Sequence, residues 1–323
     1  MSKRIPALTK KQVMANFPKR PRDSHKGMFG SVAVIGGAPG MIGAPLLAAR
    51  AALKLGAGCV HVGLLADNAP GVDPLQPELM LHRAAGLLRP HPHPNLPPQA
   101  REGANESLRE FHVNLPPERE GTNVRSMFNP DVFAIGCGMG HDMAAQKLLH
   151  DALNSGAALV LDADALNILA QRPDLCTLLL ARKAATVLTP HPGETARLLA
   201  CGIKEVQADR VAAVRQLAQK FGCSVVLKGA GSLCATRDGK LFVNQTGNPG
   251  MSAAGMGDVL TGMIAAFIAQ GMSADDALLL AVHLHGAAGD ALAEQQATIG
   301  MTATEVTEWA RWLLNRHIIL RAS

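Results

Sequence analysis

Residues 31–66 read SVAVIGGAPGMIGAPLLAARAALKLGAGCVHVGLLA and contain the unit that decides the fold. Two valine-rich apolar runs flank a run with apolar residues at helical spacing, and glycines separate the three runs. This order predicts strand, helix and strand, and a helix between two strands allows the strands to be parallel. Both strands are continuously apolar, which is typical of a sheet covered by helices on both faces.

The alternation of strand-like and helix-like runs continues along the chain. The later strand-like runs are DVFAIGCG, ALVLDADA, ATVLTPHPGE and CSVVLKGAG, and the helix-like runs include MAAQKLLHDALNSG and VAAVRQLAQKFG. From Gly255 onward the sequence is almost all helical, with Ser273 as the expected N-cap of a long helix. We predict an α/β fold with a mostly parallel central sheet and helices on both faces, in one domain over residues 1–323.

One segment breaks the alternation. Residues 89–123 are dense in Pro, Asn, Arg and Glu and cannot bury much apolar surface. We expect a disordered or loosely packed excursion. The alternative is a linker between two domains, but the strands expected within residues 32–65 are too few for an independent sheet.

The composition narrows the class of protein. An apolar fraction of 48% with 18% charged residues fits a soluble enzyme. The sequence shows no secretory signal and no run long enough to span a bilayer, so we expect a cytoplasmic protein without a membrane partner. The six cysteines lack metal-ligand spacing, which predicts free thiols and no metal ligands.

The net charge of +5 leaves several readings open. A nucleic-acid partner is disfavoured because aromatic residues make up only 3% of the chain and tyrosine is absent. Attraction to a small polyphosphate and a generally basic surface fit the charge equally well.

The glycine-rich loop after the first expected strand is similar to one known nucleotide-binding motif, and a second such motif is absent from the sequence. Gly37, Gly40 and Gly43 resemble the dinucleotide fingerprint of short-chain dehydrogenases. Those reductases use a tyrosine as proton donor, and its absence here excludes hydride transfer by that route. No segment matches GxxxxGK[ST], so a nucleotide must be held in another way.

The segment GMGDVLTG suggests that other way. It places the amides of Ala254 to Gly257 at the start of a helix, where the dipole and unpaired N–H groups favour an anion. We expect these groups to keep Asp258 ionised, ready to take a proton from a hydroxyl beside a bound phosphoryl group. In the alternative reading, Asp258 only caps the helix.

Several motifs together resemble one enzyme family. HKGMFGSVAVIGGAPGMIGAP, FAIGCGMG, LDADALNIL, LTPHPGETARLL, VVLKGAGSLCA and NQTGNPGMSAAGMGDVLTG occur in the order seen in the ADP-dependent (S)-NAD(P)H-hydrate dehydratases. The resemblance spans about Leu8 to Leu314, apart from the proline-rich insertion. It implies a ribokinase-like fold without a separate lid domain. It also implies a hydro-lyase that restores NADH or NADPH from the S epimer of its hydrate.

The family resemblance also implies roles for individual residues and ligands. Asp258 would be the base, and ADP, or alternatively ATP, would be the co-substrate, with Mg²⁺. An expected homo-oligomer, possibly a tetramer, and a separate epimerase complete the implied partners. The hydrate-binding set would be Ala44, Gly138, His191 and Asp258, and the nucleotide-binding set would be Lys228, Gly229, Ala230, Gly231, Ser232 and Gly257.

Three points stay open at the level of sequence. Met256 stands where the family usually has Thr or Ser, which could alter nucleotide preference. Asp162 and Asp164 could hold magnesium through water, or Asp164 could only cap a helix. The rival functions are a ribokinase-like kinase of a thiazole or hydroxymethylpyrimidine vitamin precursor, and a non-catalytic nucleotide sensor.

Overall fold

A computed structural model of the chain describes residues 5–88, 130–296 and 298–322. The segment 89–123, expected to be a disordered excursion, lies outside these residues. The described strands form one sheet of nine, in the order β3-β2-β1-β4-β5-β6-β7-β8-β9. The strands are β1 (Ser31–Gly36), β2 (Cys59–Leu64), β3 (Met80–Arg83), β4 (Val132–Ile135), β5 (Ala158–Leu161), β6 (Thr186–Leu188), β7 (Ser224–Leu227), β8 (Leu233–Ala235) and β9 (Leu241–Val243).

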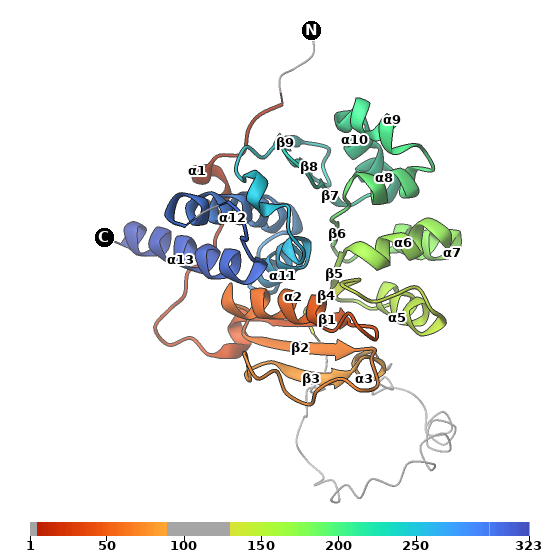
Figure 1. Cartoon of the computed structure of the whole chain (residues 1–323), viewed down its shortest axis with the longest axis horizontal. Helices are drawn as coiled ribbons and strands as arrows, with labels where there is room; N and C mark the ends of the chain where they lie inside the picture. Colours follow the sequence, from red (N-terminus) through yellow and green to blue (C-terminus); the bar gives the residue numbers. More distant parts are fainter. Residues whose placement is uncertain (1–4, 89–129, 297, 323) are drawn as a thin grey trace, which may run out of the picture.

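Helices lie on both faces of this sheet (Figure 1). Short 3-10 turns occur at η1 (Lys26–Phe29) and η2 (Pro249–Met251). The α-helices are α1 (Lys10–Val13), α2 (Gly43–Lys54), α3 (Ala84–Leu87), α5 (Met143–Leu153), α6 (Ala163–Gln171), α7 (Pro173–Ala181), α8 (Pro192–Leu199), α9 (Ile203–Ala208), α10 (Arg210–Phe221), α11 (Met256–Ala269), α12 (Ala274–Gln295) and α13 (Ala303–Ala322).

The predicted parallel strands are confirmed. Strands β1, β2, β4, β5, β6 and β7 coincide with the six strand-like runs, and the strands that are neighbours within this set pair in parallel. Ser273 is the N-cap of α12, as expected, and its hydroxyl accepts a hydrogen bond from the amide of Asp276.

Three strands were not predicted. β8 pairs antiparallel with β7, because the loop of residues 228–232 is too short for a parallel crossover, and β9 pairs antiparallel with β8 at the edge of the sheet. β3 pairs with β2 in parallel, but its four residues, MLHR, are half polar and short. The hydrophobic patterns of β3, β8 and β9 are too short or too polar to identify these strands from the sequence.

The side chains of β1 contribute to two hydrophobic cores. Val32 and Val34 belong to the cluster formed with α2, α11, α12 and α13, while Ala33 and Ile35 belong to the cluster formed with α5 to α8 and α10. Successive residues of a strand point to opposite faces, so a fully apolar strand serves both layers. Figure 1 shows the two helical layers on either side of the sheet.

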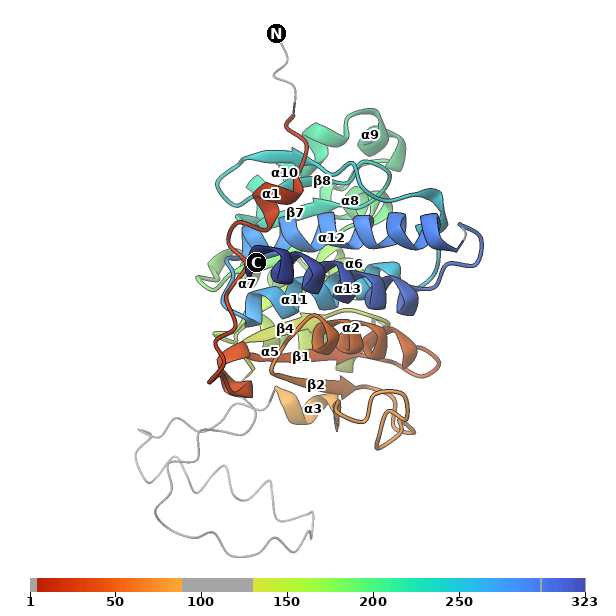
Figure 2. The same ribbon diagram turned by 90° about the vertical axis from the view of Figure 1, so that its left-hand side faces the viewer.

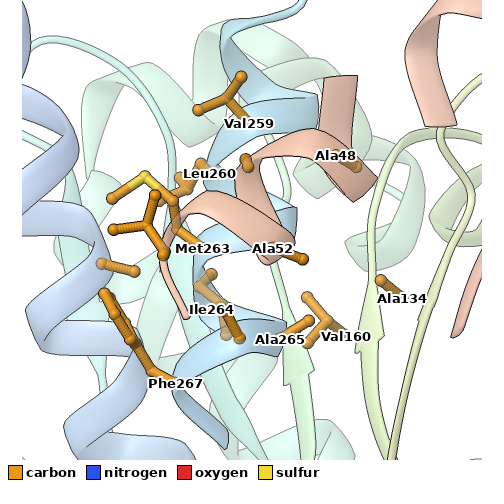
Figure 3. Packing of buried hydrophobic residues seen from close by; sticks show 14 of the residues in the cluster. Ala48, Ala52, Ala134, Val160, Val259, Leu260, Met263, Ile264, Ala265 and Phe267 are labelled. Carbon is orange, nitrogen blue, oxygen red and sulfur yellow. The ribbon is translucent and has the colours of Figure 1, made fainter. Parts of the chain in front are cut away.

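Helix α11 is packed closely against α2. A Cβ atom at Gly262 would lie 1.9 Å from the carbonyl oxygen of Ala48, so only glycine permits this approach. Figure 3 shows Ala48 and Ala52 of α2 beside α11, with Met263 and Phe267 directed into the same core. The tight packing fixes the position of the N-terminus of α11, which carries Asp258.

The outer helices complete this layer. In the view of Figure 2, α12 and α13 run side by side over α11, and α13 also contacts α2. In the described part of the chain, no helix combines the length and apolar character needed to cross a membrane.

Candidate active site

The predicted site residues lie at the carboxyl edge of the sheet. Neighbouring strands β1, β4, β5, β6 and β7 end near the loops that carry them, and this edge is where α/β proteins bind ligands. The loop after β4 contributes Cys137 and Gly138, Asp162 follows β5, His191 follows β6, and Lys228 follows β7.

Asp258 lies in the first turn of α11 and is not its N-cap. That position belongs to Gly255, whose φ of +85° is in the left-handed region that glycine tolerates. Burial raises the pKa of Asp258 to about 6, although a hydrogen bond with the Cys137 thiol acts in the opposite direction. The sequence predicted a carboxylate kept ionised by the helix dipole. Burial outweighs that effect, because it penalises the charged form.

Cys137 is a neighbour of Asp258 that the sequence did not reveal. Its side chain is fully buried, and its Sγ atom lies within 4.8 Å of carboxylate oxygens of both Asp162 and Asp258. Burial raises the pKa of this thiol well above its ordinary value, so it stays protonated and can donate to Asp258. All six cysteines are free, as predicted. The only sequence signal for Cys137 is its place between two glycines at a strand end.

Lys228 and Asp162 form a buried ion pair near Asp258. Nζ of Lys228 lies 2.6 Å from Oδ1 of Asp162, and Oδ2 of Asp162 accepts a hydrogen bond of 2.9 Å from Thr261. Burial by itself would lower the pKa of Lys228, but Asp162 and Glu194 outweigh it, and the pKa is raised. The ammonium is therefore charged at neutral pH.

The cluster of Cys137, Asp162 and Asp258 does not fit a resident magnesium ion. Mg²⁺ prefers oxygen ligands, whereas Cys137 offers a protonated thiol, and both oxygens of Asp162 are already bonded to Lys228 and Thr261. Asp164 does not cap a helix, because its carboxylate accepts a bond of 2.8 Å from the amide of Gly140 and lies 3.1 Å from Nε2 of His141. It holds the loop after β4 in place.

All six residues of the predicted nucleotide set line one cavity of about 680 Å³. The loop 228–232 forms one wall, and Gly229 and Gly231 have φ values of +135° and +62°, which favour glycine. A Cβ atom at Gly257 would lie 3.3 Å from Nζ of Lys228, so a side chain there would crowd the ammonium. The cavity thus brings together a charged lysine, a glycine-containing loop and the start of α11.

Arg210 supports this loop from behind and was missed by sequence reasoning. Its guanidinium donates to the carbonyl oxygens of Ala230 at 2.6 Å and Leu227 at 3.3 Å. Arg210 itself is not among the residues that line the cavity. The loop is both a hairpin turn between β7 and β8 and a wall of the cavity.

The predicted hydrate set lies outside the lining of that cavity. Ala44 is in the first turn of α2, and a Cβ atom at Gly138 would lie 3.2 Å from Cβ of Ala44, so the two loops touch. His191 is the N-cap of α8, which begins at Pro192. Its Nδ1 accepts from the amide of Gly193 at 2.9 Å, and its Nε2 lies 3.0 Å from Glu194.

The fold and this site define a class of protein. The sheet is mostly parallel, a cavity with a glycine-containing wall lies at its carboxyl edge, and Asp258 lies in the first turn of α11 beside that cavity. Together these are the features of a ribokinase-like enzyme. The crystal structure of a ribokinase-like superfamily protein from Enterococcus faecalis aligns with a TM-score of 0.73 and 26% identity over 97% of this chain and 96% of that one.

Within that class, the chain belongs to the NAD(P)H-hydrate dehydratase family, whose profile matches residues 32–311. It is 41% identical over 305 residues to the ADP-dependent (S)-NAD(P)H-hydrate dehydratase of Neisseria meningitidis, covering 93% of this chain and 90% of that protein. It is 36% identical to the bifunctional NAD(P)H-hydrate repair enzyme of Escherichia coli, covering 93% of this chain but only 50% of that protein.

Solved structures agree with this family. The ADP/ATP-dependent NAD(P)H-hydrate dehydratase from Bacillus subtilis, co-crystallised with ATP and Mg²⁺, aligns with a TM-score of 0.75 and 26% identity, over 98% of this chain and 99% of that one. A hydroxyethylthiazole kinase from Pyrococcus horikoshii aligns with a TM-score of 0.56 at 16% identity, over 88% of this chain and 89% of that one. The second likeness shows the shared fold alone.

Proposed function

We propose that this protein dehydrates the S epimer of hydrated NADH or NADPH and converts ADP to AMP and phosphate. The observation that carries the proposal is the juxtaposition of Asp258, at the start of α11, with the cavity formed by loop 228–232 and Gly257. The identity to the Neisseria meningitidis enzyme over nine tenths of both chains supports the same reaction.

The reaction begins with transfer of a phosphoryl group. The hydroxyl oxygen of the hydrate forms a bond to the terminal phosphorus of ADP, and the bond from that phosphorus to the bridging oxygen breaks and releases AMP. Asp258 accepts the hydroxyl proton, because its carboxylate is unprotonated at neutral pH and lies next to the helix start that attracts phosphate. Phosphate then leaves the ring, a ring proton is lost, and the carbon–carbon double bond is restored.

The remaining residues position the nucleotide. Lys228 supplies a positive charge at the cavity wall, and the unpaired amides at the start of α11 face the developing negative charge. Ala230, Gly231 and Ser232 line the same wall and present backbone groups to the nucleotide. Ala44, Gly138 and His191 are proposed to hold the hydrate, on the side of Asp258 away from the nucleotide cavity.

Further parts of the proposal rest on the relatives. Magnesium is expected to arrive with the nucleotide phosphates, as the co-crystallisation of the Bacillus subtilis enzyme with ATP and Mg²⁺ suggests. ATP is an alternative co-substrate on the same ground. A cytoplasmic homo-oligomer, possibly a tetramer, served by a separate epimerase remains our prediction from the family resemblance.

The decisive experiment measures the absorbance band of reduced nicotinamide. Purified protein and magnesium act on chemically hydrated NADH or NADPH, with ADP, ATP or no nucleotide. Recovery of the band only with nucleotide is expected, and the more effective nucleotide is the co-substrate. Folded protein that restores no band with any nucleotide would favour the vitamin-precursor kinases, which a phosphorylated thiazole or hydroxymethylpyrimidine product would then reveal.

The rate should depend on pH through Asp258. Because this carboxyl must be unprotonated and its pKa is about 6, kcat/KM should be level above pH 7 and fall toward tenfold per pH unit below pH 6. Initial rates between pH 5 and 8, corrected for the acid decay of NADH, measure this limb.

A matched pair of variants tests the assignment of the limb. Cys137→Ala removes a hydrogen bond that lowers the pKa of Asp258, so the limb should move to higher pH, whereas Cys137→Ser keeps a donor and should move it less. A profile that stays flat to pH 5, or a limb unmoved in Cys137→Ala, would contradict the role of Asp258.

A further inference from the structure

His285 of α12 lines the nucleotide cavity but has no part in the mechanism above. Its side chain is held among cavity residues that include Lys228, Leu260 and Val282. The residue is only 9% exposed, and its Nε2 atom has no hydrogen-bond partner among the residues that the structure describes. Buried polar atoms nearly always have a partner, so an unpaired nitrogen in a cavity wall points to a missing ligand.

The surroundings of the ring decide its chemical form. Burial, and then the positive charge of Lys228, lower the pKa of His285 to about 4. The ring is therefore neutral at physiological pH and offers one hydrogen-bond donor and one acceptor. A neutral ring can bond a nucleotide without repelling the ammonium of Lys228.

The position of His285 indicates which part of the nucleotide it would contact. Gly286, its neighbour, packs against Thr246, because a Cβ atom on Gly286 would lie 2.3 Å from Oγ1 of that threonine. His285 is thus placed where α12 meets the wall formed by residues 244–248, whereas Asp258, where the transferred phosphoryl group is proposed to bind, does not line the cavity. The nearest ligand atoms should belong to the part of the nucleotide that is not transferred.

We propose that His285 is a nucleotide-binding residue, whose imidazole hydrogen-bonds the adenosine 5′-monophosphate part common to ADP and AMP. This inference rests on the proposed function, which assigns the cavity to the nucleotide. It adds a side chain of α12 to a binding site otherwise built from loop 228–232 and Gly257.

The test compares affinity with turnover. His285→Ala should weaken binding of both ADP and AMP at least about tenfold in calorimetry, as expected for the loss of a buried hydrogen bond. At saturating ADP its kcat should stay within about threefold of the parent, because this residue acts in binding rather than in chemistry. His285→Gln, a neutral side chain with a donor and an acceptor, should recover part of the affinity.

His283→Ala is the matched control. It removes a histidine two residues away on the same helix, which lines a different cavity, and nucleotide affinity should not change. Parent-like affinity in a folded His285→Ala variant would overturn the inference. A fall in kcat without weaker binding would also overturn it. If the alanine variant does not fold, His285→Leu decides, because it fills the space without a hydrogen-bonding nitrogen: weaker binding of ADP and AMP at a parent-like melting temperature supports the contact, and parent-like affinity refutes it.

Nucleotide binding to the parent protein separates this inference from the proposed function. If the parent binds ADP and AMP but restores no hydrate, the proposed function fails, while the variants still support or overturn the role of His285. If the parent binds neither nucleotide at millimolar concentration, the inference about His285 is overturned directly.

Discussion

Asp258→Asn is expected to fold normally and to lose at least about a hundredfold in kcat, the usual cost of removing a general base. The asparagine side chain has nearly the same shape but cannot accept the hydroxyl proton. Its neighbours Cys137 and Lys228 keep their positions, so nucleotide binding should change little. Single-turnover recovery of the NADH band measures the chemical step directly.

The same substitution should have an effect on stability in the opposite sense. The pKa of Asp258 in the folded protein is about 6, above the ordinary value of 3.8, so the ionised form opposes folding. Well below pH 3.8 the carboxyl is protonated in both states, and the parent and the variant should be equally stable. As the pH rises through 6, the parent loses stability relative to Asp258→Asn.

Urea unfolding at pH 4.5 and pH 8 tests this linkage, with an upper limit of about 3 kcal/mol for a shift of about two pH units. Asp164→Ala is a useful comparison, because it removes the carboxylate that accepts a hydrogen bond from the amide of Gly140 and should therefore destabilise the protein. A variant at Asp258 with full turnover would refute the base, and one much less stable than the parent at pH 8 would refute the burial argument.

Lys228→Met is expected to destabilise the fold by about 3–5 kcal/mol, because it leaves the carboxylate of Asp162 buried and unpaired. Asp162 is only 1% exposed, and among the described residues its remaining side-chain partner is the hydroxyl of Thr261. Methionine replaces the length of the lysine stem but not its charge. Urea unfolding at pH 7 measures the loss, and nucleotide affinity should fall in the same variant.

The double variant Asp162→Asn, Lys228→Met separates charge from packing. It removes the uncompensated carboxylate as well as the ammonium, so it should be more stable than Lys228→Met by at least about 2 kcal/mol. It should remain inactive, since the cavity still lacks its cation. Equal stability of the single and double variants would show that packing, rather than the unpaired charge, accounts for the loss.

The site was readable from sequence where it depends on backbone. Glycines at positive φ, as at Gly229 and Gly231, and an aspartate at a helix start leave local signals, because the conformations they need are encoded in adjacent residues. The six residues that the family resemblance assigns to the nucleotide line one cavity, and their contact with a nucleotide remains a prediction. The roles of Ala44, Gly138 and His191 remain predictions, since no contact with a substrate tests them.

Contacts between distant segments were not readable. Cys137 and Asp258 are separated by more than a hundred residues in sequence, and His285 lies more than fifty residues after Lys228. The raised pKa of Asp258 follows from burial by residues of other elements, which no local pattern records. Likewise, the pairing of Lys228 with Asp162 depends on β5 and β7 being two strands apart in the sheet.

The sequence by itself determined the parallel α/β architecture and the helix start that carries Asp258, because hydrophobic period and glycine placement act over a few residues. Only the tertiary structure decided the protonation of Asp258, the partner of Lys228 and the neutral ring of His285. Those properties depend on which side chains exclude water and which charges meet, and both are set by the packing of segments far apart in the chain.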